Sequence, residues 1–179
     1  MATAILFDLI GVLAEPSWRE LVALPRGRPW DALKTGVIEE AAFWPATAAA
    51  TYRRVLALRA DRLDLARHLR GRGHPIYVAS NFALPWIEAL RARPGAELFD
   101  GWFVSAELGV AKPDPRFFAR ARAQVGVDAI LVADQEENCA AARGAGLRAI
   151  WAWPGRDLGG AIEAELTGVS VGDPSGSVP

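Results

Sequence analysis

The sequence predicts an α/β fold, a doubly wound parallel sheet of Rossmann type that carries a small helical cap. Five short apolar runs have the length and composition of buried parallel strands, and helical patterns lie between them. This alternation is typical of a parallel sheet covered by helices. The first run ends abruptly at Asp8, and Gly11 follows three residues later. Open α/β sheets place their ligand sites at such strand ends, and Gly11 would let the chain turn sharply.

Length and composition fit a single globular domain. The chain has 179 residues, enough for one sizeable core with a small insertion. Its net charge of -1 gives no reason to expect nucleic acid or an anionic membrane as a partner. The single cysteine, Cys139, excludes an internal disulfide and is expected to pack under the sheet as a small apolar residue.

The first residues do not have the pattern of a targeting signal. No basic region precedes the first apolar run, and Asp8 interrupts that run too early for a signal peptide. No uncharged stretch approaches the roughly 18 residues that a membrane span requires. We therefore expect a cytoplasmic protein.

Residues 15–60 lack strand patterning and are punctuated by four prolines. We interpret this segment as a small helical cap inserted after the first strand, of the kind that closes over a site and selects the substrate. The alternative is that its helices merely extend the core. Helices are expected at 18–24, 30–34, 39–44 and 47–59.

Residues 1–14 and 61–167 form the predicted core. Residues 168–179 are rich in Gly, Ser and Pro, and we expect them to form a flexible tail. Within the core, strands are expected at 75–79, 101–104, 129–133 and 147–151, and helices at 61–71, 85–93, 114–125, 136–143 and 157–166.

Several helix ends have recognisable signals. The helix that begins at residue 61 is expected to end at Gly71 or Gly73, because glycine is favoured just beyond a helix C-terminus. Asp114 can cap the helix that Pro115 opens, and Gly126 ends it. These signals agree with the strand–helix alternation.

The stretch 7–13, Phe-Asp-Leu-Ile-Gly-Val-Leu, resembles the first motif of the haloacid dehalogenase-like (HAD) hydrolases, which usually has the form FDxDGVL or FDxDGTL. The resemblance implies that Asp8 is the nucleophile and a metal ligand. The second aspartate of that motif is the family's general acid and base. Ile10 occupies its position here.

Two further stretches resemble the second and third motifs. Ser80, followed by Asn81, matches the Ser or Thr whose hydroxyl holds a phosphoryl oxygen. Lys112 lies in Val-Ala-Lys-Pro-Asp-Pro-Arg-Phe-Phe, a close match to the third motif. The resemblance implies that its charge steadies both Asp8 and the transferred anion. It thus makes Asp8, Ser80 and Lys112 catalytic, and Ser80, Asn81 and Lys112 substrate-binding.

Asp134 resembles the acidic residue of the fourth motif, which usually ligates magnesium. The acid that normally precedes it is Ala133 in this chain. Asp8 and Asp134, at neighbouring strand ends, would supply hard oxygen ligands suited to Mg²⁺. The family also uses the backbone carbonyl at the position of Ile10, and a side-chain change does not remove that carbonyl. The implied metal ligands are therefore Asp8, Ile10 and Asp134.

The resemblance implies a hydrolase, either a phosphatase or a phosphoryl-transfer enzyme, with a phosphorylated metabolite as substrate. Ile10 can neither protonate a leaving alcohol nor activate water, which is help worth about 10²–10⁴-fold. Acyl and aryl phosphates, which have better leaving groups, should lose least. Other side chains could replace the missing acid, and the candidates are Glu15, Asp31, Glu39, Glu40 and His74.

Two other functions stay open. A 2-haloacid dehalogenase also uses an Asp nucleophile without the second acid and needs no metal, but it usually carries Ser and Asn where this chain has Asp134. A catalytically degenerate member, which binds a ligand or partner or performs a non-phosphatase reaction, fits the apolar residues Ile10 and Ala133. Asp8 could also simply cap a turn, and Lys112 could be a solvated loop charge. We prefer the site roles because the four motifs occur in order.

Overall fold

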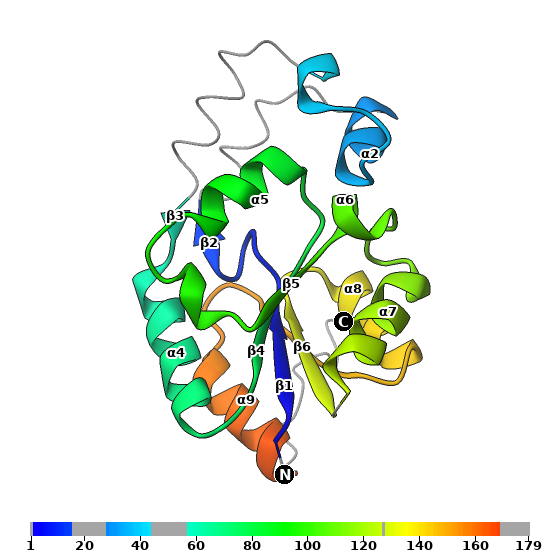
Figure 1. The fold of residues 1–179 in the computed structure, drawn as a ribbon. Coiled ribbons are helices and arrows are strands. Elements are labelled where there is room, and N and C mark those ends of the chain that lie inside the picture. The colour runs from blue at the N-terminus through cyan, green and yellow to red at the C-terminus, as the bar shows by residue number, and fades with distance from the viewer. Residues whose placement is uncertain (1, 16–27, 44–56, 127, 169–179) are drawn as a thin grey trace.

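The computed structural model describes residues 2–15, 28–43, 57–126 and 128–168. Its centre is a five-stranded sheet in which every neighbouring pair is parallel, in the order β5-β4-β1-β6-β7 (Figure 1). The strands are β1 (Ala4–Phe7), β4 (Ile76–Ser80), β5 (Gly101–Val104), β6 (Ala129–Ala133) and β7 (Arg148–Trp151). The predicted parallel sheet is therefore confirmed, and β1, which ends just before Asp8, is its middle strand.

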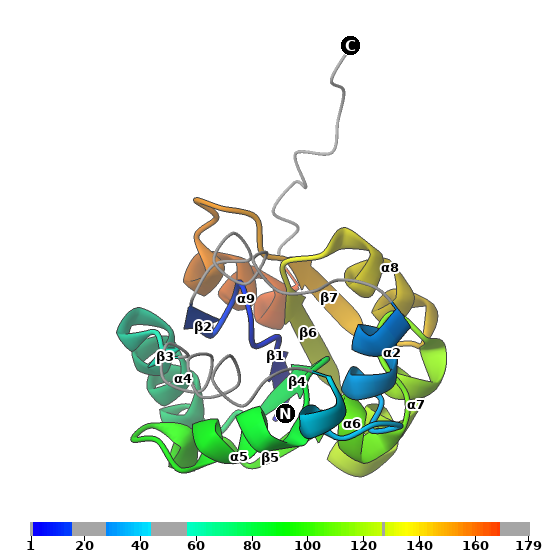
Figure 2. The ribbon, with the colours of Figure 1, turned by 90° about the horizontal axis from the view of Figure 1, so that it is seen from above.

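Helices cover both faces of the sheet (Figures 1 and 2). On one face, Ile5 and Phe7 of β1 pack in a core cluster with residues of the helices α4 (Ala60–Gly71), α5 (Leu84–Arg91) and α9 (Leu158–Thr167). On the other face, Ala4 and Leu6 pack with α7 (Pro115–Val125) and α8 (Glu136–Gly144). Alternate residues of β1 thus belong to opposite cores, as side-chain alternation along a strand requires.

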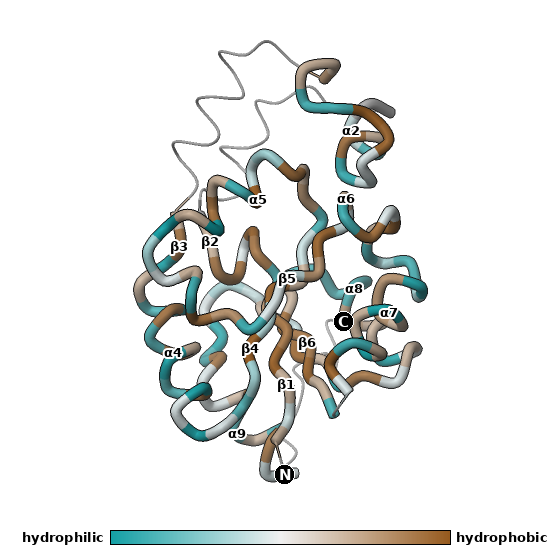
Figure 3. Tube along the Cα trace, in the orientation of Figure 1, coloured by the Kyte–Doolittle hydropathy of each residue, from teal (hydrophilic) through white to brown (hydrophobic). Residues whose placement is uncertain are grey.

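Both faces of the inner strands are apolar because both are buried. All four residues of β1 and all five of β6 are buried. In Figure 3 the hydrophobic colour gathers on these strands, while the helices alternate between hydrophobic and hydrophilic residues. This burial explains why the strands are recognisable in the sequence as continuous apolar runs.

The core helices begin and end close to the predicted positions. Helix α7 begins after Asp114 and ends before Gly126, which has the left-handed conformation expected of a C-terminal glycine. Helix α4 ends at Gly71. The prediction did not include two short elements, α6 (Ser105–Leu108) and the 3₁₀ helix η2 (Ala96–Leu98), because they have too few residues to show a periodic pattern.

The segment preceding α4 differs from its prediction. Ala57–Leu58 form a short strand, β3, which pairs antiparallel with β2 (Ala14–Glu15), so the helix expected at 47–59 is wrong at its end. Arg59 N also donates to Leu13 O over 2.9 Å. The chain therefore returns beside the point at which it left the core, and backbone pairing with β2 decides its conformation. The rest of that expected helix, the helix at 18–24 and the tail residues 169–179 lie outside the described residues.

Two elements of the predicted cap are described, α2 (Arg28–Lys34) and the 3₁₀ helix η1 (Glu40–Ala42). They lie beyond the carboxyl ends of the strands, next to α5 and α6 (Figure 1). Helix α2 confirms the helix expected at 30–34, whereas the helix expected at 39–44 is a single 3₁₀ turn. The division into a core and a cap at 15–60 stays a prediction.

Side chains on two core elements hold this segment in place. Ser105 Oγ hydrogen-bonds to Lys34 O at the end of α2, and Trp86 Nε1 donates to a Glu40 carboxylate oxygen. Trp30 of α2 lies 6.2 Å from Trp86, measured between ring centroids, and 6.5 Å from Phe82. Residues 28–43 thus contact the core through aromatic packing and buried polar bonds.

None of the helices in the described ranges combines the length and the apolar character that a bilayer span needs.

The cap of α7 gives a test of stability against pH. Asp114 accepts hydrogen bonds from the Arg116 side chain and from Arg116 N, which lower the pKa of the Asp114 carboxyl from 3.8 to about 2. A lowered folded-state pKa stabilises the fold above the unfolded pKa, and this stabilisation is lost as the pH falls from about 4 through about 2. We expect Asp114→Asn, which keeps a capping oxygen, to melt below the wild type near neutral pH. The difference should shrink to nothing in acid.

Thermal unfolding followed by circular dichroism over that pH range measures the difference. The Asp114–Arg116 ion pair is exposed to solvent, so added salt should reduce the difference in melting temperature between the variant and the wild type at neutral pH. A melting difference that stays constant on acidification would contradict the assignment of Asp114 as a charged cap.

Candidate active site

The centre of the site is an ion pair between Asp8 and Lys112. Lys112 Nζ lies 2.6 Å from Asp8 Oδ2, and the two side chains are only 1% and 9% exposed, respectively. Asp8 follows β1 directly, its backbone N donates to Val132 O of β6 over 2.8 Å, and its Oδ1 accepts a hydrogen bond from Leu9 N. Each oxygen of the carboxylate therefore has a donor, and its direction is fixed by the central strand and its neighbour.

Lys112 is held by residues at and just beyond the end of β4. Its ammonium group donates to Ala79 O over 2.7 Å as well as to Asp8. The side-chain amide of Asn81 makes two bonds to the backbone of Lys112: Lys112 N donates to Asn81 Oδ1 at 2.8 Å, and Asn81 Nδ2 donates to Lys112 O at 2.7 Å. The loop between α6 and α7, which contains Lys112, is thus attached to the end of the strand that finishes at Ser80.

Asp134 lies beside this pair at the end of β6. Burial, together with the negative charge of Asp8, raises the pKa of the Asp134 carboxyl from 3.8 to about 6, and the charge of Lys112 opposes this shift. Trp151 Nε1 donates to Asp134 O over 3.0 Å, which ties the backbone of Asp134 to β7. The structure therefore brings the Asp134 carboxyl close enough to Asp8 and Lys112 for both charges to act on its pKa.

Gly11 makes room for Asp134. Its φ angle is 83°, in the left-handed region, and a Cβ atom built on it would lie 2.8 Å from Asp134 Cγ. Any side chain at position 11 would therefore collide with the carboxyl group. The sequence predicts a turn at Gly11 but not this contact, because the contact depends on which strand lies next to β1.

Ser80 and Ile10 complete the set of predicted residues. Ser80 is the last residue of β4 and is 1% exposed, and its hydroxyl makes no hydrogen bond within the described ranges. Ile10 is partly buried and packs against the larger core cluster. Its carbonyl oxygen accepts no hydrogen bond in the part of the chain that the structure describes. The Ser80 hydroxyl and the Ile10 carbonyl oxygen can therefore each still bond to another group.

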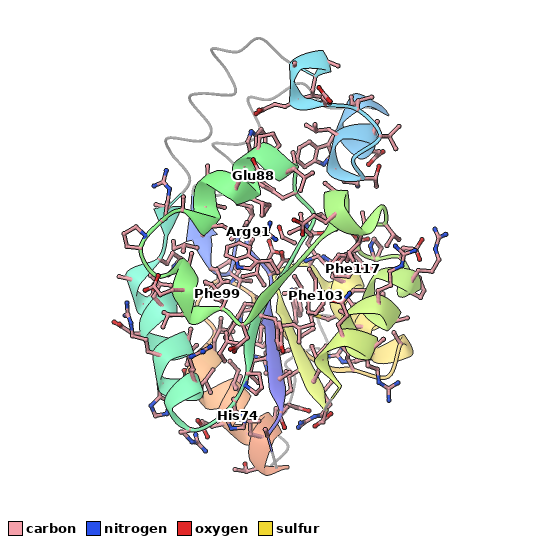
Figure 4. All side chains as sticks on the ribbon, viewed as in Figure 1. His74, Glu88, Arg91, Phe99, Phe103 and Phe117 are labelled. Carbon is pink, nitrogen blue, oxygen red and sulfur yellow. The ribbon has the colours of Figure 1, made fainter. Side chains whose placement is uncertain are left out.

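The candidates for the missing acid differ in position. The prediction for His74 is wrong, because its Nδ1 lies 3.1 Å from Thr3 O at the amino end of the sheet (Figure 4), whereas Asp8 follows the carboxyl end of β1. Asp31 pairs with Lys34 at 2.7 Å, and Glu40 bonds to Trp86. Glu39 is exposed at the start of η1. The side chain of Glu15 is outside the described part of the structure.

A carboxylate at the end of the central parallel strand thus lies beside a buried ammonium group and a second acid. A sequence model of the haloacid dehalogenase-like hydrolase family matches residues 30–146. The chain therefore belongs to this family, as the first-motif resemblance implied.

The chain is also similar to individual relatives. A sesquiterpene phosphatase from Aspergillus oryzae is 30% identical over 169 residues, which span 80% of this chain and 86% of the relative. A HAD family enzyme from Bacteroides thetaiotaomicron has a TM-score of 0.73 at 20% identity, covering 90% of this chain and 98% of that one. A HAD-like hydrolase from Porphyromonas gingivalis has a TM-score of 0.72 at 22% identity, covering 93% and 98%. These two structures establish the shared fold.

The contact between Gly11 and Asp134 gives a second test. We expect Gly11→Ala to destabilise the protein by more than about 2 kcal/mol, because it adds a steric collision to the strain of about 1–2 kcal/mol for a left-handed alanine. Gly73→Ala is the matched control, since Gly73 has a φ of 86° with nothing within 4 Å of its Cβ position. Urea unfolding of both variants gives the two free energies. Equal losses would show that the space beside Asp134 does not matter.

Proposed function

We propose that this chain is a magnesium-dependent phosphatase in which Asp8 is the nucleophile. The observation that carries the proposal is the 2.6 Å contact between Lys112 Nζ and Asp8 Oδ2, with the Asp134 carboxyl beside it. Transfer of a phosphoryl group to a carboxylate needs an aimed nucleophile, positive charge and hydrogen-bond donors for the phosphoryl oxygens. The four predicted motifs supply residues of each kind.

A divalent cation fits the donor set. Asp8 and Asp134 offer hard oxygens, and the carbonyl of Ile10 has no other partner among the described residues. The described part of the chain contains no cluster of three or more Asp, Glu, His or Cys side chains that could hold a metal ion. Water would therefore complete the coordination of Mg²⁺. The Bacteroides enzyme was solved in complex with magnesium and inorganic phosphate, which supports the proposal. The cation, when bound, supplies positive charge for the phosphoryl oxygens.

The residues of the chain have different roles in the proposed reaction. Asp8 attacks phosphorus, the bond from phosphorus to the substrate oxygen breaks, and the phosphoryl group passes to the carboxylate. Lys112 holds Asp8 in position and offsets the charge of the anion, and the Ser80 hydroxyl donates to one phosphoryl oxygen. Water next attacks the aspartyl phosphate, which releases inorganic phosphate and restores Asp8. Ile10 gives no proton to the first step and takes none in the second. The leaving oxygen therefore takes its proton from solvent, and the attacking water releases its proton to solvent.

An apolar organic phosphate is the substrate class that the structure favours. Ile10 places an aliphatic side chain two residues from the nucleophile. The segment 28–43 contributes Trp30 and Phe43, whose rings lie 6.1 Å apart and pack partly buried against the same core cluster. Partly exposed apolar side chains suit a hydrocarbon group better than a sugar. The similarity to a sesquiterpene phosphatase supports the same class.

A comparison of substrates tests the proposal. We expect Mg²⁺-dependent release of phosphate from farnesyl phosphate, at least about tenfold faster in kcat/KM than from glucose 6-phosphate, because the apolar group gains binding energy. Asp8→Asn should lower kcat by more than about 10³-fold while the protein stays folded, because the nucleophile is lost. Thermal unfolding of the variant is the control. Equal phosphate release by Asp8→Asn and the wild type would refute the role of Asp8.

Ile10 favours a second candidate function, a HAD protein that binds a ligand or partner without hydrolysing phosphate esters. An apolar residue at the acid–base position removes help worth about 10²–10⁴-fold in each half-reaction. The fold and the Asp8–Lys112 pair would then serve binding alone. Activity of the unaltered chain separates the two candidates.

Substitution at position 10 measures how much the rate depends on a proton donor that isoleucine cannot provide. If the chain is a phosphatase, Ile10→Asp should raise kcat on a simple alkyl phosphate by about 10²-fold or more, because the new carboxyl can protonate the alcohol. The gain should be smaller on acetyl phosphate, whose leaving group needs no proton. Ile10→Asn is the matched control and should give no gain. Similar rates for the Asp and Asn variants would show that a proton donor is not limiting.

A further inference from the structure

We propose that Asn81 is a positioning residue for Lys112 and not a substrate ligand. This inference rests on the proposed function, because it assigns Lys112 a part in phosphoryl transfer. The resemblance implied that Asn81 contacts the substrate. In the structure its amide oxygen and amide nitrogen are both engaged, at 2.8 Å and 2.7 Å, by the backbone N and O of Lys112.

We call this pair of hydrogen bonds between Asn81 and Lys112 the clamp. The two residues are 31 positions apart and lie in different loops, so the side chain of Asn81 joins two separate backbone segments. Within the described part, no other side chain bonds to the backbone of Lys112. Loss of the clamp would therefore free the main chain from which the lysine side chain extends.

The other end of Lys112 depends on this spacing. Its ammonium group donates to Ala79 O, two residues before Asn81, and to Asp8 Oδ2. An ammonium group has three N–H donors, so one is left for an oxygen of the transferred anion. The amine of Lys112 is thus fixed by Ala79 near the end of β4, and its backbone is fixed by Asn81 just beyond that strand. These bonds together set the direction of the third N–H donor.

Burial makes the position of the amine critical. The Lys112 side chain is 1% exposed, and a buried ammonium group that loses a partner is costly to hold there. A backbone shift of about 1 Å can lower a rate by about 10²-fold when it moves a catalytic group. Asn81 would therefore act on the chemical step through Lys112, without touching the substrate.

The first measurement is steady-state kinetics of Asn81→Ala on farnesyl phosphate. We expect kcat to fall by about 10–10²-fold, with KM changed by less than about threefold, because substrate contacts remain while the amine is misplaced. Asp100→Ala is the matched control: Asp100 Oδ2 accepts a hydrogen bond from Ile76 N at the opposite end of β4, and it should lower the melting temperature but leave kcat unchanged. A rise in KM with kcat unchanged would make Asn81 a substrate ligand and overturn the proposal.

The second measurement does not depend on activity. Lysine labelling by an acylating reagent, followed by peptide mass spectrometry, reports the exposure of the Lys112 amine. We expect labelling of Lys112 to be at least about tenfold faster in Asn81→Ala than in the wild type or in Asp100→Ala, because local opening exposes a buried group. Unchanged labelling would overturn the clamp. If the wild type hydrolysed no phosphate ester, the phosphatase assignment would fail, and labelling alone would still decide the role of Asn81.

Discussion

The buried ion pair between Asp8 and Lys112 is the constraint on which the rest of the site depends. Removing two charges from water costs several kcal/mol for each ion, and their attraction offsets this cost only when the geometry is good. The sheet provides that geometry, because Val132 O fixes the backbone of Asp8 and Ala79 O receives the amine of Lys112. Loss of either partner would leave an uncompensated charge in the interior, at a cost of about 3–5 kcal/mol. The same bonds that stabilise the fold therefore aim the carboxylate.

The second acid is arranged by different means. Asp134 has room because Gly11 has no side chain, and its backbone is held by the Trp151 indole of the adjacent strand. Its carboxyl is half-buried next to a second negative group, which disfavours ionisation. Such a pair is unfavourable in the free protein and becomes favourable once a cation lies between the oxygens. The site thus holds two carboxylates whose repulsion a metal ion would relieve.

Most of the fold could be predicted from the sequence because parallel strands are buried on both faces. The apolar run before Asp8 and the run 129–133 are continuous, and each ends at a carboxylate, so strand ends and acids were found together. The β2–β3 pair could not be predicted, because strands of two residues have no periodicity and the alanines before Ala57 favour a helix. There, pairing with a distant segment overrides local propensity.

The residues of the candidate site could be predicted where a sequence motif or a strand end marks their position. Asp8, Ser80, Lys112 and Asp134 follow strand ends or a distinctive Lys-Pro-Asp-Pro segment, so their convergence could be expected from topology. The role of Asn81 could not be expected, because it depends on a partner 31 residues away. His74 failed as a candidate for a related reason. Its place at the amino end of the sheet follows from the direction of β4, which begins two residues later.

The aromatic contact between Trp30 and Trp86 has a spectroscopic consequence. One indole belongs to the segment 28–43 and the other to α5 of the core, with ring centroids 6.2 Å apart, and Phe82 packs 4.7 Å from Trp86. Indole emission responds to the polarity and contacts of the ring, so separation of these two surfaces would change the intrinsic fluorescence. A change in the intrinsic fluorescence of the protein would therefore report separation of the segment 28–43 from the core, without any added dye.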